Sequence, residues 1–362
     1  DDEYAIICKD KPVFYKNGAQ VDKEFQEFSW VEKDLGLGSH KHYMHKEIFE
    51  QTAQSEILLR NINSDLQFNK LREKIKQAKK LVFTACGTAY FASLVGVMGF
   101  HKTDVEAQSL IASEFQHFAN LPEDSLVIAV SQSGETMDTI KGIQYAKEQG
   151  ADTACIVNTP FSSIERLCDV SVQIHSGQEI AVASTKAFTN QALLLLALAG
   201  KLPEHAPEAI AKVLAKEETI AKIAKKISGE HLYVLGRHYG YPIAREIALK
   251  IKEVSYVHAE GMMAGELKHG TIALIEKNTP VIGIVYNNHP LMRSALAEVS
   301  ARGAQVITIG TTPKDTIHIE EDDEHLFGIL SAIVVQLLAY HIANNKGLPI
   351  DKPRNLAKSV TV

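Results

Sequence analysis

A cluster of hydroxyl-bearing residues follows one apolar segment of the chain. Residues 131–136 read Ser-Gln-Ser-Gly-Glu-Thr and lie between an expected strand, Leu126–Val130, and an expected helix, Met137–Lys147. Hydroxyls and backbone N–H groups at the start of a helix converge at its positive end and favour an anion. Gly134 permits close approach of the backbone, and the segment lacks the lysine of triphosphate-binding loops, so it favours a monophosphate. The alternative is that the hydroxyls only cap the helix.

Three charged residues follow helical spacing in a second segment. Glu246, Lys250 and Glu253 occupy positions i, i+4 and i+7 of an expected helix from about Pro242 to Val257. This spacing places an acid, a base and an acid along one stripe. Isoleucines and valines make the helix apolar over much of its circumference, so some of these charges are expected to be half buried, as functional carboxylates often are. A surface ladder of ion pairs is the alternative.

Residues 258–270 are rich in glycine and in titratable groups and are expected to form a catalytic loop between two ordered elements. His269, between Lys268 and Gly270, has the chemistry of an acid or a base near pH 7. A histidine that only faces solvent fits the same pattern, and the sequence alone does not choose between the two.

The last eleven residues, 352–362, read as a basic and frayed terminus. Another interpretation is that Arg354, Asn355 and Lys358 donate hydrogen bonds to an anionic sugar. Lys358 could also form an imine with a carbonyl carbon if burial lowered the pKa of its amine.

The elements that must position these groups occur twice. A buried strand, a turn and a helix follow one another in both halves of the chain, and the helices of the second pair are Met137–Lys147 and Leu291–Arg302. The matching strands are Lys80–Ala85 with Leu232–Gly236, Leu126–Val130 with Val281–Val285, and Gly150–Val157 with Gly303–Ile309. The chain is therefore a tandem duplication of an α/β unit.

Apolar strands that alternate with helices predict parallel sheets covered on both faces. Each half is expected to be a doubly wound, flavodoxin-like α/β/α sandwich, with ligands bound outside the carboxyl ends of the strands. Residues 285–290 of the second half occupy the position of the hydroxyl cluster without its hydroxyls. The cluster is therefore not a requirement of the fold.

Composition limits the functional classes. A length of 362 residues predicts two core-forming units, and a net charge of −6 argues against a nucleic-acid partner. The apolar run Ala192–Leu198 is too short to cross a membrane. The four cysteines show no paired spacing, so no metal site is expected and a reducing cytoplasm is the default location. Short strands near residues 4–15 lack partners and are expected to be the stub of an upstream domain.

Several segments resemble the isomerase region of the glutamine:fructose-6-phosphate aminotransferase family and occur in the order of that family. They are residues 42–51, 86–88, 112–115, 131–136, 182–189, 265–270 and 353–362. The resemblance implies two sugar-isomerase (SIS) domains, at 45–210 and 211–347. Residues 1–44 would be a remnant of a glutaminase domain and its linker, and residues 348–362 a C-terminal active-site tail.

The resemblance also implies roles for individual residues. The residues that would hold the substrate phosphate are Ser131, Gln132, Ser133 and Thr136. The residues that would line the sugar are Thr88, Val182, Ser184 and Ala357. Lys358 would form the imine, Glu253 would move a proton between C1 and C2 with Lys250 beside it, and His269 would open the sugar ring. Because the family places that histidine in the site of the partner subunit, a homodimer is implied.

The implied activity is conversion of fructose 6-phosphate and ammonia to glucosamine 6-phosphate, without a cofactor, a metal or a membrane. Two departures limit it: Ala89 stands where many members of the family have a phosphate-contacting serine, and the N-terminal cysteine nucleophile that hydrolyses glutamine is missing. We therefore expect this chain to bind fructose 6-phosphate, to interconvert it with glucose 6-phosphate, to use free ammonia weakly at best, and not to use glutamine.

Two other functions remain open. Another enzyme with two SIS domains, such as a deglycase or a sugar-phosphate deaminase, would share the phosphate site. The C-terminal tail and Glu253 are the features that distinguish the aminotransferase from such an enzyme. A non-catalytic sugar-phosphate sensor would use the same fold for regulation, but the presence of Lys358, Glu253 and His269 argues against it.

Overall fold

The computed structural model describes residues 3–9, 11–23, 25 and 36–361, in two compact units, Asp1–Gly36 and Leu37–Val362. The described part of the first unit is an antiparallel sheet of β1 (Glu3–Ile6), β2 (Val13–Lys16) and β3 (Ala19–Val21). Asn17 and Gly18 connect β2 to β3 with φ of 50° and 78°, as a two-residue hairpin turn requires. The short strands predicted at this end are confirmed.

The second unit contains two five-stranded parallel sheets with the same topology. The first runs β5-β4-β6-β7-β8 and the second β10-β9-β11-β12-β13. The first sheet comprises β4 (Lys80–Ala85), β5 (Ala107–Ile111), β6 (Ser125–Ser131), β7 (Asp152–Val157) and β8 (Val170–Gln173). The second comprises β9 (His231–Gly236), β10 (His258–Met263), β11 (Pro280–Val285), β12 (Gln305–Gly310) and β13 (Ile317–His318). The predicted duplication and the doubly wound fold are confirmed.

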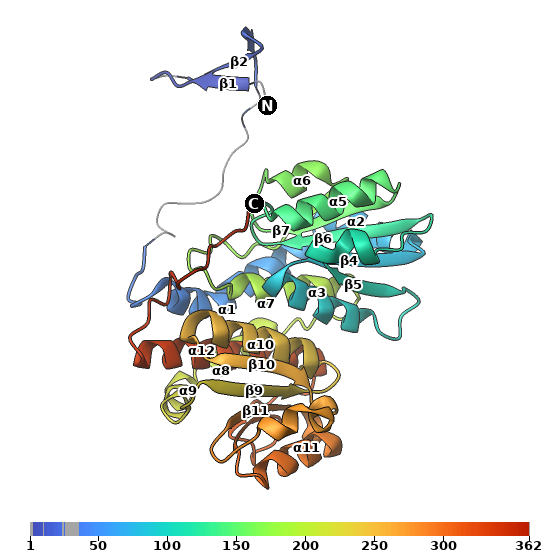
Figure 1. The fold of residues 1–362 in the computed structure, drawn as a ribbon. Coiled ribbons are helices and arrows are strands. Elements are labelled where there is room, and N and C mark those ends of the chain that lie inside the picture. The colour runs from blue at the N-terminus through green and yellow to red at the C-terminus, as the bar shows by residue number, and fades with distance from the viewer. Residues whose placement is uncertain (1–2, 10, 24, 26–35, 362) are drawn as a thin grey trace. The chain divides into compact units, whose positions relative to one another are not determined.

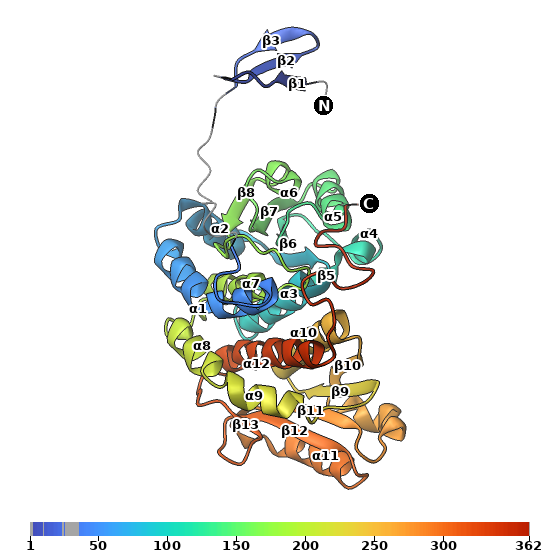
Figure 2. The same ribbon diagram turned by 90° about the vertical axis from the view of Figure 1, so that its left-hand side faces the viewer.

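Helices cover both faces of each sheet. They are α1 (Tyr43–Ile62), α2 (Leu66–Gln77), α3 (Gly87–Phe100), α4 (Phe115–Phe118), α5 (Met137–Glu148), α6 (Ser163–Leu167), α7 (Lys186–Leu198), α8 (Ala206–Leu214), α9 (Glu217–Ala224), α10 (Gly240–Ser255), α11 (Pro290–Ser300) and α12 (Glu324–Asn345). Short 3₁₀ helices are η2 (Ala112–Glu114), η3 (Glu266–His269), η4 (Thr271–Leu274) and η5 (Tyr286–Asn288). Figures 1 and 2 show α3, α7, α10 and α12 between the two sheets, with α5 and α11 on the outer faces.

The helices between the sheets join both α/β halves into one hydrophobic core. A single cluster of buried side chains runs from α1 and α3 through α7 to α10 and α12, while each outer helical layer has a smaller cluster of its own. By length and composition, helix α12 could cross a bilayer, which the shorter apolar run at 192–198 could not. However, 94% of its most apolar window is buried in the protein. Its apolar composition is therefore explained by its position in the core.

The predicted loop at 258–270 is wrong over its first six residues. Residues 258–263 form the edge strand β10, which pairs in parallel with β9, and η3 follows. A side chain at Gly261 would place its Cβ only 2.2 Å from the carbonyl oxygen of Ala244 in α10. The glycine thus permits close packing of the helix on the strand and does not mark a loop.

Helix α1 holds two segments that are distant in sequence. Asp351 accepts hydrogen bonds from the backbone N–H groups of Tyr43 (3.0 Å) and Met44 (2.9 Å) and so caps the helix. The carbonyl of Asp351 also accepts from the N–H of Val182 at 3.0 Å. One turn further along α1, Glu47 accepts from the N–H groups of Ile180 and Ala181. The helix therefore fixes both the C-terminal tail and the segment 180–182.

Glu47 is buried under this segment with an altered pKa. Burial and the nearby carboxylate of Glu179 raise the pKa of Glu47 from its ordinary 4.5 to about 8. Its second oxygen, Oε2, is buried and has no hydrogen-bond partner among the described residues. Near neutral pH the folded protein therefore keeps a proton on Glu47 that the unfolded chain releases.

Glu47→Gln tests this linkage. Because the pKa is raised in the folded state, the stabilisation from the bound proton is complete below about pH 4.5 and is lost as the pH rises to about 8. The glutamine does not titrate, so we expect the stability of the variant relative to wild type to increase by roughly 2 to 4 kcal/mol between about pH 5 and about pH 8. Urea denaturation at both pH values measures this change, and a difference that does not vary with pH would contradict it.

Candidate functional site

The turns that follow β4 and β6, the segment before α7 and the C-terminal tail surround one pocket of about 350 Å³. It lies at the switch point of the first sheet, between β4 and β6, where doubly wound folds bind ligands. The predicted site residues that line it are Thr88, Ser131, Gln132, Ser133, Thr136, Val182, Ser184, Lys250, Glu253, Ala357 and Lys358. The structure thus brings together every predicted site residue except His269.

The hydroxyl turn before α5 is held by its own side chains. Ser131 accepts a hydrogen bond from the N–H of Gly134 at 3.0 Å, and Ser133 accepts from the N–H of Glu135 at 3.1 Å. Gly134 has φ of 66°, and a Cβ there would lie 2.0 Å from the hydroxyl of Ser162, so only glycine fits. Thr136 is the N-cap of α5, yet its hydroxyl makes no capping bond among the described residues. Helix capping therefore does not explain Thr136, which lines the pocket.

The charged side chains on α10 reach the same pocket from the half of the chain that contains the second sheet. Lys250 is 1% exposed and pairs with Glu253 at 2.7 Å and with Glu246 at 3.5 Å. Its Nζ also donates to the hydroxyl of Thr88 at 2.8 Å, which links α10 to the turn after β4. Glu246 is 1% exposed and Glu253 is 20% exposed. The predicted burial is confirmed, and the alternative of a surface ladder of ion pairs is wrong.

Burial and pairing shift the titration of this group. Burial raises the pKa of Glu246 to about 8, despite the opposing charge of Lys250. Burial acts to lower the pKa of Lys250, but the carboxylates of Glu246 and Glu253 raise it above its ordinary value. The two carboxylates therefore favour the cationic form of Lys250 in the pocket wall, where a cation can stabilise negative charge that develops on a bound ligand.

The C-terminal tail is docked on the protein over residues 352–361, which the structure describes. The N–H of Met137 donates to the carbonyl of Val360 at 3.1 Å, so the tail passes the start of α5. Lys358 enters the pocket and donates from Nζ to Glu179 at 2.6 Å and to the carbonyl of Ala181 at 2.8 Å. Arg354 instead lies over the ring of Tyr256, 4.3 Å from its centroid, and neither Arg354 nor Asn355 is among the residues that line this pocket.

Glu179 is a residue that the sequence analysis did not identify. Its side chain is fully buried and accepts from the N–H groups of Thr185 and Ala187 and from the hydroxyl of Ser184. Burial acts to raise the pKa of Glu179, but the charge of Lys358, its hydrogen bond and the N–H of Thr185 hold it at about 2. The only signal in the sequence is an acid three residues before the segment 182–189.

His269 is the last residue of η3, which follows the edge strand β10 of the second sheet. It is exposed to solvent. It does not line the pocket in the described part of one chain. Its assignment to the site of a partner subunit stays a prediction.

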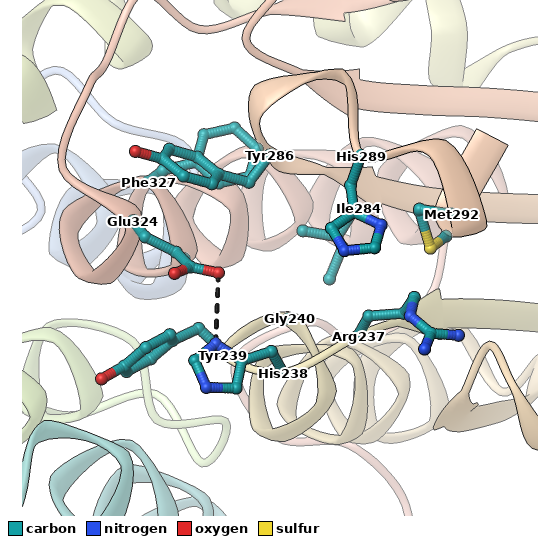
Figure 3. Close-up of a pocket in the computed structure, with 11 residues that line it drawn as sticks. Arg237, His238, Tyr239, Gly240, Ile284, Tyr286, His289, Met292, Glu324 and Phe327 are labelled. Atoms are coloured by element: carbon teal, nitrogen blue, oxygen red, sulfur yellow. Dashed lines mark hydrogen bonds and ion pairs between the residues drawn. The ribbon is translucent and has the colours of Figure 1, made fainter. Parts of the chain in front are cut away.

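The second SIS unit has a much smaller pocket at the equivalent place. The turns after β9 and β11 enclose about 40 Å³ between Arg237–Gly240, Tyr286 and His289, with Phe327 of α12 as one wall. Glu324 points across it toward His238, and the two side chains lie 3.3 Å apart (Figure 3). Side chains thus fill most of the second switch point, whereas the first remains open.

Comparisons with known proteins agree with this geometry. The SIS domain model matches residues 74–201 and 227–345, which contain the two parallel sheets. Glutamine--fructose-6-phosphate aminotransferases [isomerizing] of Thermotoga maritima and Aquifex aeolicus are 35% and 38% identical to the whole chain. The chain spans 66% and 65% of their respective lengths.

Solved structures give the same fold. The C-terminal domain of glucosamine-fructose-6-phosphate aminotransferase from Francisella tularensis superposes with a TM-score of 0.77 at 34% identity, over 88% of this chain and 99% of that domain. A glucosamine-6-phosphate deaminase from Thermotoga maritima, at 24% identity and a TM-score of 0.75, shares the fold. The chain therefore belongs to the SIS domain family, with one SIS domain around each parallel sheet.

Proposed function

We propose that this chain is the isomerase part of a glutamine:fructose-6-phosphate aminotransferase and that it converts fructose 6-phosphate and ammonia to glucosamine 6-phosphate. The observation that carries this proposal is that a hydroxyl turn, a half-buried carboxylate and a lysine from the far end of the chain line one pocket of about 350 Å³. The names of its relatives support the same activity. In the longer protein, glutamine would supply the ammonia.

The phosphate would bind at the start of α5. Ser131, Ser133 and Thr136 supply hydroxyls there, Gln132 adds an amide, and the positive end of the helix favours the negative charge. Ala89 also lines this pocket and contributes no donor. A phosphate at this end leaves the sugar carbons between the tail and α10, where Thr88, Val182, Ser184 and Ala357 line the space.

The chemistry would take place between Lys358 and Glu253. The neutral amine of Lys358 adds to the C2 carbonyl of the open-chain ketose, and loss of water gives an imine. Ammonia then displaces the lysine amine from C2. Glu253 removes a proton from C1 while the imine nitrogen gains one, which gives an enolamine. A proton then adds at C2 as the C1 hydroxyl loses its own, which leaves the amine on C2 and an aldehyde at C1. The cation of Lys250 would stabilise the intermediate between these two proton transfers.

A homodimer and a cytoplasmic location complete the proposed function. His269 is exposed in a single chain, which is consistent with a role in the site of a second copy, and a homodimer would bring it there. Opening of the sugar ring would then depend on the dimer. A cytoplasmic location, with fructose 6-phosphate as the substrate and no membrane or nucleic-acid partner, fits this activity.

Trapping of the imine separates an enzyme from a sensor. Incubation with fructose 6-phosphate and borohydride is expected to reduce the imine to a stable secondary amine on Lys358, visible as a mass increase of the chain. Lys358→Ala removes the amine and is expected to give no adduct. Lys352→Ala, which alters an exposed lysine of the same tail, serves as the matched control and is expected to react like wild type. An adduct that persists in Lys358→Ala would contradict the proposed role.

Thr136→Val tests the phosphate site. This change removes one hydroxyl at nearly constant volume and breaks no capping bond in the described structure. We expect the Kd for fructose 6-phosphate to rise about tenfold with unchanged thermal stability, since a hydrogen bond to a charged group is lost.

Titration calorimetry measures this change. His289→Ala, in the corresponding turn of the second SIS domain, is the control and is expected to bind like wild type. Equal affinities of wild type, Thr136→Val and His289→Ala would mean that the phosphate binds elsewhere.

A further inference from the structure

The amine of Lys358 makes two hydrogen bonds within the protein. Its Nζ donates to Oε2 of Glu179 at 2.6 Å and to the carbonyl of Ala181 at 2.8 Å. The side chain of Lys358 is 25% exposed and that of Glu179 is 0% exposed. Separation of this short pair would leave a fully buried carboxylate without its partner, which is costly. As the cation of this ion pair the nitrogen has no lone pair to add to a carbonyl.

Three donors besides Lys358 hold the carboxylate of Glu179. One of its oxygens accepts from the N–H groups of Thr185 and Ala187 at 2.8 and 3.2 Å, and the other accepts from the hydroxyl of Ser184 at 3.0 Å. All three donors belong to the segment that also lines the sugar pocket. The amine of Lys358 must therefore leave the carboxylate of Glu179 to bond to the carbonyl carbon of a bound sugar.

The other charged groups near this pair have partners of their own. On α7, Lys186 pairs with Glu50 of α1 at 2.7 Å, and on α10, Lys250 pairs with Glu253 at 2.7 Å. Glu47 of α1 faces Glu179 and carries a proton near neutral pH, because its pKa is raised to about 8. Among the described residues, Glu179 is therefore the carboxylate paired with Lys358.

We propose that Glu179 is a positioning residue that holds the ammonium group of Lys358 in a fixed place at the pocket and sets the pH at which the imine forms. This inference rests on the proposed function. The ammonium first releases one proton to solvent, which the partly exposed side chain permits. The neutral nitrogen then adds to the carbonyl carbon, and the adduct expels the carbonyl oxygen as water, so that a C=N bond replaces the C=O bond. Glu179 exchanges no atom in this sequence.

The experiment follows imine formation against pH in the full chain. Wild type and Glu179→Gln are incubated with fructose 6-phosphate and cyanoborohydride from about pH 6 to about pH 10, and the adduct is quantified by mass spectrometry. Glutamine keeps the size and an acceptor oxygen but not the charge. We expect the pH of half-maximal trapping to fall by about one to three units in this variant, because the carboxylate no longer favours the ammonium form.

Glu50→Gln is the matched control. It removes a carboxylate that pairs with the buried Lys186 nearby, and it is expected to keep the midpoint of wild type. A lower yield of adduct at every pH with an unchanged midpoint would mean that Glu179 only supports the structure, and would overturn the inference. If Glu179→Gln does not fold, Glu179→Asp keeps the charge but moves it away by one methylene group, and it is expected to shift the midpoint in the same direction by a smaller amount.

A second readout requires no sugar. The rate at which acetic anhydride acetylates Lys358, measured by peptide mass spectrometry against pH, reports the titration of the amine directly, with the exposed Lys352 as internal reference. Its midpoint is also expected to fall in Glu179→Gln. A shift in acetylation without any imine in wild type would contradict the proposed function and retain Glu179 as the group that holds the amine. An unchanged acetylation midpoint would overturn the inference.

Discussion

The site depends on the docking of the C-terminal tail across the carboxyl edge of the first sheet. Asp351 caps α1, its carbonyl binds Val182, Lys358 pairs with Glu179, and the carbonyl of Val360 accepts from the start of α5. These contacts join the last residues of the chain to elements more than a hundred residues earlier. Without them the hydroxyl turn and Lys250 would still line the pocket, but Lys358 would not.

The duplication explains why one pocket needs both units. The first SIS domain supplies the hydroxyl turn, while α10 of the second SIS domain supplies Lys250 and Glu253 from the layer between the sheets. The second unit retains the topology but has a pocket of about 40 Å³ where the first has about 350 Å³. Its contribution to the large pocket therefore comes from a helix, and its own switch point is narrowed by Glu324, Phe327 and neighbouring side chains.

Local pattern was sufficient for most of the fold and much of the site. The apolar strands and the turns after them are encoded within ten residues, so three strands of each sheet and the hydroxyl turn could be predicted. Strand β10 could not, because Gly261 reflects the close packing of α10, a tertiary contact. The pair of Glu179 and Lys358 joins residues 179 positions apart, and nothing near Glu179 in the sequence indicates that it is buried. The pattern of the segment singled out His269, but its role in the site of a partner subunit came from the resemblance, and the pocket of a single chain does not include it.

The central claim is that one sugar is held by its phosphate at the hydroxyl turn and by its carbonyl carbon at the tail lysine. A crystal structure of the chain with fructose 6-phosphate measures both contacts at once. The account predicts phosphate oxygens within hydrogen-bond distance of Ser131, Ser133 and Thr136, and electron density continuous from C2 to Nζ of Lys358. A sugar bound in this pocket with its phosphate away from the turn, or with Lys358 still paired to Glu179 and far from C2, would contradict the account.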